Sequence, residues 1–214
     1  DAQEKKLTIT AVTQPLNTQP QFTRVDQVVL RDGLKAKSGG RIEVQVSSHA
    51  ERSLGGQEVL RLVRAGQVDI GASPLSTVSG DVPFLHGVDL AGLHPDITLA
   101  RKVADALVPL ANKELEKFSQ FIIATYPFPA QVVFCRQPVS SLADLKGRKV
   151  RVQGASQGDL VEALGGTSVT IPFAEVVPPL ERGVVNCGIT GTMPAYKAGW
   201  HEVVDYVFEL PLGF

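Results

Sequence analysis

The first part of the chain alternates between strand-like and helix-like patterns of apolar and polar residues. Apolar residues at every second position predict strands, as in the run Leu7–Val12. Between such runs apolar residues recur at helical spacing, as at Val25, Val28, Val29 and Leu34. The predicted order is strand 7–12, helix 22–37, strand 41–46, helix 57–63 and strand 68–71. This order predicts a parallel sheet with right-handed crossover connections.

A proline break divides the chain, because the same pattern restarts after it. A long helix is predicted over 96–117 and a strand over 121–126, and Pro127-Phe128-Pro129 follows. Beyond the break we predict strands 131–136, 147–153, 168–171 and 184–190, helices 156–164, 173–182 and 194–200, and an extended stretch 203–210. Pro178-Pro179 predicts that the helix 173–182 is short or kinked. We therefore expect an α/β fold with a first lobe at 1–126, a second at 127–210 and a return crossover at 211–214.

Composition narrows the classes of function. The chain has 214 residues, is 43% hydrophobic and 20% charged, and carries a net charge of −1, which is typical of a globular protein. The absence of a basic excess argues against nucleic acid as a partner. No apolar run reaches the roughly 20 residues that a membrane-spanning helix needs. The four histidines (His49, His86, His94, His201) and the two cysteines show no metal-ligand spacing, so we expect neither a metal nor a cofactor.

Arg151 is the strongest candidate for a binding residue. It lies inside the run Gly147–Gln153, which otherwise reads as a buried strand, and an apolar helical pattern follows near Ser156. A guanidinium is thus delivered to the carboxyl end of a strand beside a helix N-terminus, where open α/β sheets bind anions. The alternative is a structural ion pair with Asp159 or Glu162.

Polar residues also follow two strands of the first part of the chain. Thr13 and Gln14 come after the first strand, and Ser73, Ser76 and Thr77 come after the strand 68–71. Loops at the carboxyl ends of strands are natural positions for ligand contacts. A solvated turn is the alternative reading of the loop after the first strand.

Several motifs occur in an order that resembles one family. They are Ser141-Leu142-Ala143-Asp144-Leu145-Lys146-Gly147-Arg148-Lys149-Val150-Arg151-Val152, Ala163-Leu164-Gly165-Gly166, Pro172-Phe173-Ala174-Glu175-Val176, Glu181-Arg182-Gly183-Val184-Val185-Asn186 and, in the first half, Ala65-Gly66-Gln67-Val68-Asp69-Ile70-Gly71. The chain resembles the solute-binding proteins of tripartite ATP-independent periplasmic (TRAP) transporters over essentially its whole length. The resemblance implies a two-lobe periplasmic-binding-protein-like fold. Each lobe would be a mostly parallel sheet flanked by helices, and crossing strands would join the two.

The resemblance also implies a function. It implies no catalysis, a bacterial periplasmic location with the signal peptide already removed, and capture of a small organic acid for delivery to TRAP membrane permease subunits. The chain itself would not be embedded in the membrane. Members of this family usually run on for roughly another hundred residues, so by the resemblance the C-terminal part of the fold is lacking.

By the same resemblance Arg151 holds the ligand carboxylate, which suits its planar fork of donors. A second contact of the family falls on Gln131, and a third falls near Thr190 and its neighbour Thr192. Because Gln131 is uncharged, a monocarboxylate is favoured over a dicarboxylate. Phe173 is a candidate to pack over the ligand. The alternatives are a strand-edge role for Gln131, helix capping for the threonines and a core position for Phe173.

Cys135 and Cys187 both lie at ends of predicted strands of the second lobe. In an oxidising periplasm two such cysteines can pair, and a Cα–Cα separation beyond about 7 Å would exclude the pair.

Two other classes of function remain open. Cys187 and His201 can be read as the nucleophile and base of an enzyme, although no acid follows at a telling spacing. A ligand-sensing domain of a regulator uses a similar two-lobe fold.

Overall fold

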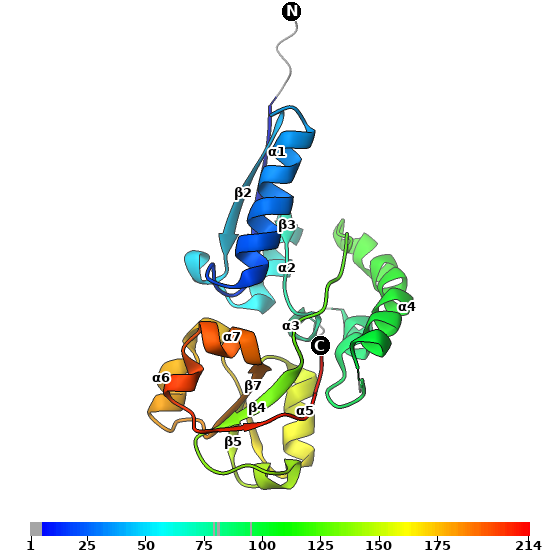
Figure 1. Ribbon diagram of the computed structural model, residues 1–214. Helices are drawn as coiled ribbons and strands as arrows, with labels where there is room; N and C mark the ends of the chain where they lie inside the picture. The colour runs from blue at the N-terminus through cyan, green and yellow to red at the C-terminus, as the bar shows by residue number, and fades with distance from the viewer. Residues whose placement is uncertain (1–5, 79, 81, 95) are drawn as a thin grey trace, which may run out of the picture. The chain divides into compact units, whose positions relative to one another are not determined.

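The computed structural model describes residues 6–78, 80, 82–94 and 96–214, and the chain falls into two compact units (Figure 1). The first unit extends to Pro74 and the second is Leu75–Phe214. This division falls at a different place from the predicted lobe boundary between residues 126 and 127. The lobes 1–126 and 127–210 and the crossover 211–214 therefore stay predictions about the complete family fold.

The first unit is built on a three-stranded sheet in the order β2-β1-β3, in which both pairs are parallel. Its elements are β1 (Leu7–Thr13), η1 (Gln21–Gly33), α1 (Leu34–Lys37), β2 (Ile42–Ser48), η2 (Ala50–Arg52), α2 (Gly56–Arg64) and β3 (Ile70–Gly71). Strand β1 pairs with β2 from Leu7 opposite Ile42 to Thr13 opposite Ser48. The parallel sheet predicted from the alternating pattern is thus present.

The long first helix buries a different face from the one its apolar residues suggest. Element η1 is a π-helix that continues into α1, and it buries Phe22 and Asp26. Val25, Val28 and Val29 are 47%, 55% and 63% exposed. A π-helix has more residues per turn than an α-helix, so positions four and five apart, rather than three and four apart, come to share a face. The prediction of a helix here is correct.

The second unit contains a five-stranded mixed sheet in the order β6-β5-β7-β4-β8. Its strands are β4 (Gln131–Cys135), β5 (Lys149–Val152), β6 (Thr167–Thr170), β7 (Cys187–Gly191) and β8 (Tyr206–Phe208). Its helical elements are α3 (Leu75–Val78), η3 (Pro83–Asp89), α4 (Ile97–Leu115), η4 (Glu116–Phe118), η5 (Leu142–Leu145), α5 (Ala155–Ala163), η6 (Phe173–Glu175), α6 (Val177–Glu181), α7 (Thr192–Lys197) and η7 (Trp200–Glu202). Strand β5 is parallel to β6 and β7, whereas β4 is antiparallel to β7 and β8.

Local sequence explains how β5 is positioned. The carboxylate of Asp144 accepts hydrogen bonds from the backbone N–H groups of Ser140 and Ser141, which caps η5. Gly147 then turns the chain at φ 74°, a left-handed conformation that favours glycine, and β5 begins two residues later. Further on, Pro178 and Pro179 occupy the first turn of α6, which is only five residues long, as the proline pair predicted.

The predicted strand at 121–126 is wrong. These residues have no regular structure, and Phe121 and Ile123 are 72% and 71% exposed. The backbone of Ile122 bonds instead to the side chain of Asn112, with its N–H donating at 2.7 Å and its carbonyl accepting at 3.3 Å. An apolar run of this kind forms a strand only where a neighbouring strand satisfies its backbone, and no described strand pairs with this stretch.

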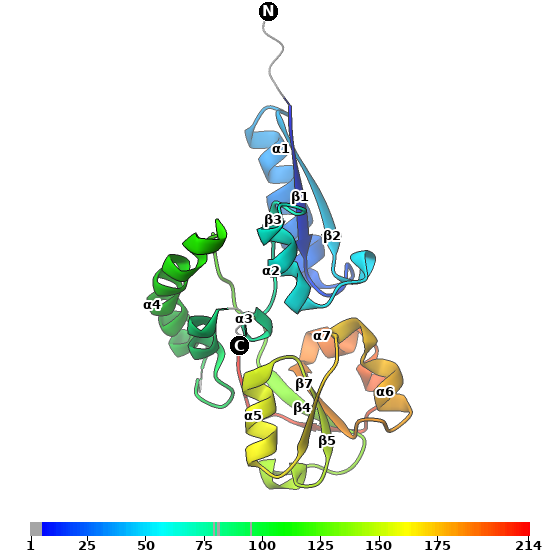
Figure 2. The same ribbon diagram turned by 180° about the vertical axis from the view of Figure 1, so that it is seen from behind.

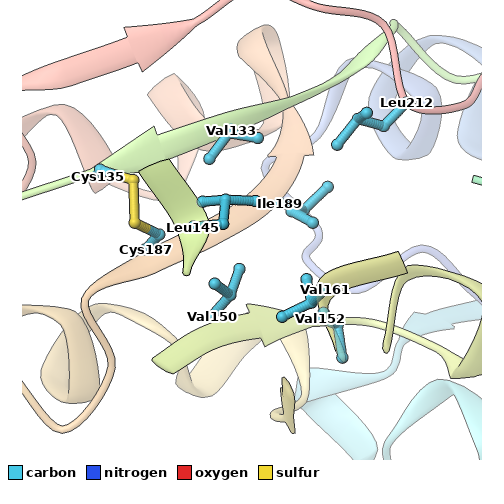
Figure 3. Packing of buried hydrophobic residues seen from close by; sticks show 9 residues of the cluster. All are labelled: Val133, Cys135, Leu145, Val150, Val152, Val161, Cys187, Ile189 and Leu212. Atoms are coloured by element: carbon cyan, nitrogen blue, oxygen red, sulfur yellow. A yellow bond between two sulfur atoms is a disulfide. The ribbon is translucent and has the colours of Figure 1, made fainter. Parts of the chain in front are cut away.

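Helix α5 covers one face of the five-stranded sheet, and α6 and α7 cover the other (Figures 1 and 2). The α5-side cluster, shown in Figure 3, comprises Val133, Cys135, Leu145, Val150, Val152, Val161, Cys187, Ile189 and Leu212. The α7-side cluster comprises Val132, Phe134, Val176, Leu180, Val185, Ala195, Trp200 and Val204. Each fully buried aliphatic side chain contributes about 1.5–3 kcal/mol by leaving water.

Cys135 and Cys187 form a disulfide in this structure (Figure 3). They lie directly opposite each other on the antiparallel strands β4 and β7, with a Cα–Cα distance of 4.1 Å. Both side chains are fully buried in the α5-side cluster. The bond thus joins two strands across a sequence separation of 52 residues.

Removing this disulfide is expected to lower the free energy of unfolding by about 4 kcal/mol, because a loop of 52 residues is released in the unfolded state. Urea unfolding of the wild type and of the double variant Cys135→Ala/Cys187→Ala measures the difference. A thiol reductant should shift the midpoint of the wild type and leave that of the double variant unchanged. Free thiols in the unreduced, denatured wild type would contradict the bond.

Candidate functional site

Arg151 is buried on the α7-side face of the five-stranded sheet. It lies on β5 between Val150 and Val152, whose side chains belong to the α5-side cluster. Since successive side chains of a strand alternate between faces, Arg151 points to the opposite side. Its side chain is only 1% exposed, and Gly188 of β7 is its partner in register.

The guanidinium of Arg151 is held by carbonyl groups and by no carboxylate of the described residues. Its Nε donates to the carbonyl of Ile171 at 3.0 Å, and its Nη1 donates to the carbonyl of Ile189 at 2.9 Å. Its Nη2 donates to no described residue. The alternative ion pair with Asp159 or Glu162 is absent, and Glu162 accepts a hydrogen bond from Ser168 Oγ at 2.8 Å instead.

Burial has a clear electrostatic effect on this group. It lowers the pKa of Arg151 to about 9, from the ordinary value of 12.5, because the charged form loses solvation. The guanidinium therefore still carries its proton at neutral pH. The result is a buried positive charge with donor capacity left over, which is the chemistry that binds an anion.

Two aromatic rings lie against this guanidinium. Its Cζ is 5.8 Å from the ring centroid of Phe173 and 5.7 Å from that of Trp200. The two rings stack on each other at 5.8 Å. Phe173 was a candidate from the sequence, whereas Trp200 was missed. The only available signal for it was that Trp200 is the single tryptophan of the chain.

The two candidate threonines lie in different settings. Thr190 is 3% exposed on β7, two residues beyond the partner of Arg151, so it lies on the same face of the sheet as Arg151. Thr192 is exposed at the first position of α7, where Gly191 is the N-cap residue. The structure thus brings Thr190, but not Thr192, onto the buried face that carries Arg151.

Gln131 lies on the other face of the sheet. On β4 it alternates with Val132, so it shares the α5-side face with Val133 and Cys135. Its Nε2 donates to the carbonyl of Pro129 at 3.0 Å, and its backbone N–H donates to the carbonyl of Gly213. The structure therefore does not bring Gln131 together with Arg151.

The candidates from the first part of the chain are divided between the two units. Thr13 and Gln14 are both 2% exposed at the carboxyl end of β1. Burial raises the pKa of Asp26, and the side-chain hydrogen bonds of Thr13 and Gln14 to its carboxyl group partly offset that rise. Asp26, buried on η1, is a polar residue of this group that sequence reasoning missed. Ser73, also in the first unit, donates to the carbonyl of Gly56 at 2.9 Å.

Ser76 and Thr77 belong to the second unit, on α3. Ser76 is 2% exposed and hydrogen-bonds the side chain of Asp89 on η3, whereas Thr77 is half-buried. A Cβ at Gly213 would lie 2.8 Å from Asp89 Oδ1, so this carboxyl is packed against the backbone of Gly213. Burial raises the pKa of Asp89 to about 6, and the bond from Ser76 only partly offsets that effect.

The alternative enzyme reading of Cys187 and His201 is wrong. Cys187 is bonded to Cys135 and has no thiol to act as a nucleophile. His201 stacks on Tyr196, with ring centroids 4.6 Å apart. In the part of the chain that the structure describes, no group of three or more histidine, cysteine or acidic side chains is placed to hold a metal ion. None of the described helices is both long and apolar enough to cross a membrane.

Comparison with known proteins finds matches over most of the chain. The family model of bacterial extracellular solute-binding proteins, family 7, matches residues 13–209. A solute-binding protein of Sulfitobacter sp. (strain NAS-14.1) is 26% identical over 152 residues, which are 70% of this chain and 46% of the relative. The 2,3-diketo-L-gulonate-binding periplasmic protein YiaO of Escherichia coli (strain K12) is 27% identical over 180 residues, 82% of this chain and 54% of the relative.

A similar solved structure is that of DctP7, a Bordetella pertussis extracytoplasmic solute receptor binding pyroglutamic acid. It has a TM-score of 0.89 and 24% sequence identity, and the match covers 97% of this chain and 68% of that one. This likeness confirms the predicted fold class. The chain spans about half the length of the curated relatives that it matches.

The buried carboxyl of Asp89 generates a prediction about pH. Because its folded pKa of about 6 lies above the ordinary 3.8, the folded state holds a proton that the unfolded state has released. The free energy of unfolding should therefore fall as pH rises from about 4 through 6, by up to about 2 kcal/mol after allowance for partial exposure.

Urea unfolding at pH 4.5 and 7.5 measures this loss. Asp89→Asn should remove it, because the amide carries no proton to lose in this range. The matched control is Asp105→Asn, which removes one negative charge from an exposed position on α4. An equal loss of stability in the wild type and Asp89→Asn would contradict the prediction.

Proposed function

The chain belongs to family 7 of the bacterial extracellular solute-binding proteins, as its resemblance to TRAP-transporter binding proteins predicted, and we propose that it captures a small organic acid by its carboxylate. The members of this family are binding proteins of transport systems rather than enzymes. The observation that supports the proposal is the charge of Arg151, which is buried without a carboxylate partner among the described residues.

The hydrogen bonds of Arg151 favour an anionic ligand with paired oxygens. The Nε–H donates to the carbonyl of Ile171, and one N–H of Nη1 donates to the carbonyl of Ile189. The N–H groups that are left over include the two on Nη2. A carboxylate can accept parallel bonds from such a planar fork. Thr190, on the same buried face, is the proposed polar neighbour of the ligand, and Phe173 is proposed to pack near it.

A monocarboxylate is the favoured ligand. Gln131, the residue predicted to supply a second contact, is uncharged and belongs to the opposite face of the sheet. It therefore supplies no second cation for a second carboxylate. The bound acids of structural relatives, pyroglutamate and galacturonate among them, are consistent with this ligand class.

The wider role is proposed from the family. Delivery of the acid to TRAP membrane permease subunits, a periplasmic location and prior removal of a signal peptide belong to this proposal. Gln131, Thr13, Gln14, Ser73, Ser76, Thr77 and Thr192 stay candidates for further contacts with the ligand. No feature of the described residues favours the ligand-sensing domain of a regulator instead.

Replacing Arg151 is expected to remove binding without unfolding the protein. Isothermal titration with pyroglutamate, galacturonate, gulonate and fuconate identifies the acid that binds the wild type. Arg151→Ala should weaken that affinity about 100-fold or more, because a charge-assisted paired contact is lost. Arg151→Lys should also bind poorly, since an ammonium offers no planar fork.

The matched control is Lys149→Ala, which removes a positive charge from an exposed position of the same strand. Its affinity should equal that of the wild type, and circular dichroism should show that all three variants are folded. Unchanged affinity in folded Arg151→Ala would refute the assignment.

A further inference from the structure

The described groups around Arg151 stabilise its positive charge, but none of them carries a negative charge that would neutralise it. A buried arginine is usually accompanied by a carboxylate, which would satisfy its donors and neutralise it. Here two backbone carbonyls and the faces of two aromatic rings take that place. Carbonyl dipoles and ring quadrupoles stabilise a cation, yet neither carries a net charge that would repel an incoming anion.

A glycine on the neighbouring strand makes room for one of these rings. Gly188 is the partner of Arg151 in register. A Cβ at this position would lie 2.7 and 2.9 Å from ring atoms of Trp200 and 3.7 Å from the Cβ of Arg151. The indole therefore lies across β7 in the space that any other residue would fill, beside the stem of the arginine.

The polar end of the indole does not explain this position. Trp200 is fully buried, and its Nε1 donates to none of the described residues. Buried tryptophans usually find a partner for that N–H, and leaving it unpaired has a desolvation cost. The ring is part of the α7-side cluster, and within it lies against Phe134 edge-to-face at 5.7 Å, against Phe173 stacked at 5.8 Å, and against the guanidinium.

We propose that Trp200 is a positioning residue, which acts with Phe173 to hold the Arg151 guanidinium in one orientation with its charge unneutralised. Two bonds, from Nε and Nη1, fix the plane of the group, and the two rings restrict its movement out of that plane. A preorganised fork loses less entropy when a carboxylate binds. The inference rests on the proposed function of Arg151 as the anchor of the ligand.

Isothermal titration with pyroglutamate and galacturonate tests the effect on binding. Trp200→Leu keeps an apolar side chain but removes the ring face, and we expect about tenfold weaker binding. Trp200→Phe retains a ring face and should recover most of the affinity. Phe173→Leu, at a half-buried position, should also weaken binding. Phe208→Leu removes a ring that packs on the α5-side cluster and should bind as the wild type does.

A second measurement needs no ligand. The Nε–H of Arg151, bonded to a carbonyl and close to two rings, should give a ring-shifted and slowly exchanging side-chain NMR signal, assigned by its absence in Arg151→Lys. In Trp200→Leu that signal should move towards the position of solvent-exposed arginines. If this variant does not fold, Gly188→Ala and Phe173→Leu displace or remove one ring each and should shift the signal in the same direction.

The two proposals fail separately. Unchanged affinity in Arg151→Ala overturns the function proposed for Arg151. Loss of binding in Arg151→Ala, together with wild-type affinity and an unmoved Nε–H signal in Trp200→Leu, overturns only the role of Trp200. If neither acid binds the wild type, the NMR signal decides: an unmoved signal in the ring variants overturns the positioning role, and a displaced signal supports it.

Discussion

The second unit depends on keeping one positive charge inside a β-sheet without an acid beside it. Burial disfavours the charged form of Arg151 strongly enough to lower its pKa to about 9. The fold offsets this cost with the carbonyls of Ile171 and Ile189 and with the faces of Phe173 and Trp200. Such an arrangement costs stability in the empty protein, and a bound carboxylate, as proposed for Arg151, would offset that cost.

The two faces of the five-stranded sheet serve different purposes. The α5-side face is apolar and carries the disulfide that joins β4 to β7, so it holds the strands in register. The α7-side face carries Arg151 and Thr190 among aromatic side chains. Gly188 has no side chain, so the Trp200 ring can lie directly over β7 on the face that carries Arg151.

Much of the fold and part of the site were predictable from local pattern. The strands β1 and β2 follow from alternation and those of the second sheet from short buried runs, and Arg151 stood out because a charge interrupted such a run. The failures have physical causes. The apolar spacing of Val25 and Val28 predicted the helix but not its face, because η1 is a π-helix that buries Phe22 and Asp26 and leaves both valines exposed. The stretch 121–126 has a strand pattern, but no described strand pairs with it. Gln131, selected by counting along the chain, lies on the opposite face of the sheet from Arg151, because the face of a side chain changes with every residue, and its contact with the ligand stays a prediction.

By itself the sequence determined the α/β class, the family and the identity of the buried cation, because these depend on periodicity and on motifs of neighbouring residues. The tertiary structure alone decided what surrounds that cation. Trp200 and Gly188 lie 49 and 37 residues beyond Arg151, and only strand pairing and helix packing bring them together. The same long-range contacts decided that Gln131 faces away and that no described acid reaches Arg151. Contacts between distant segments leave no periodic signal in the sequence, since they depend on which faces meet after folding.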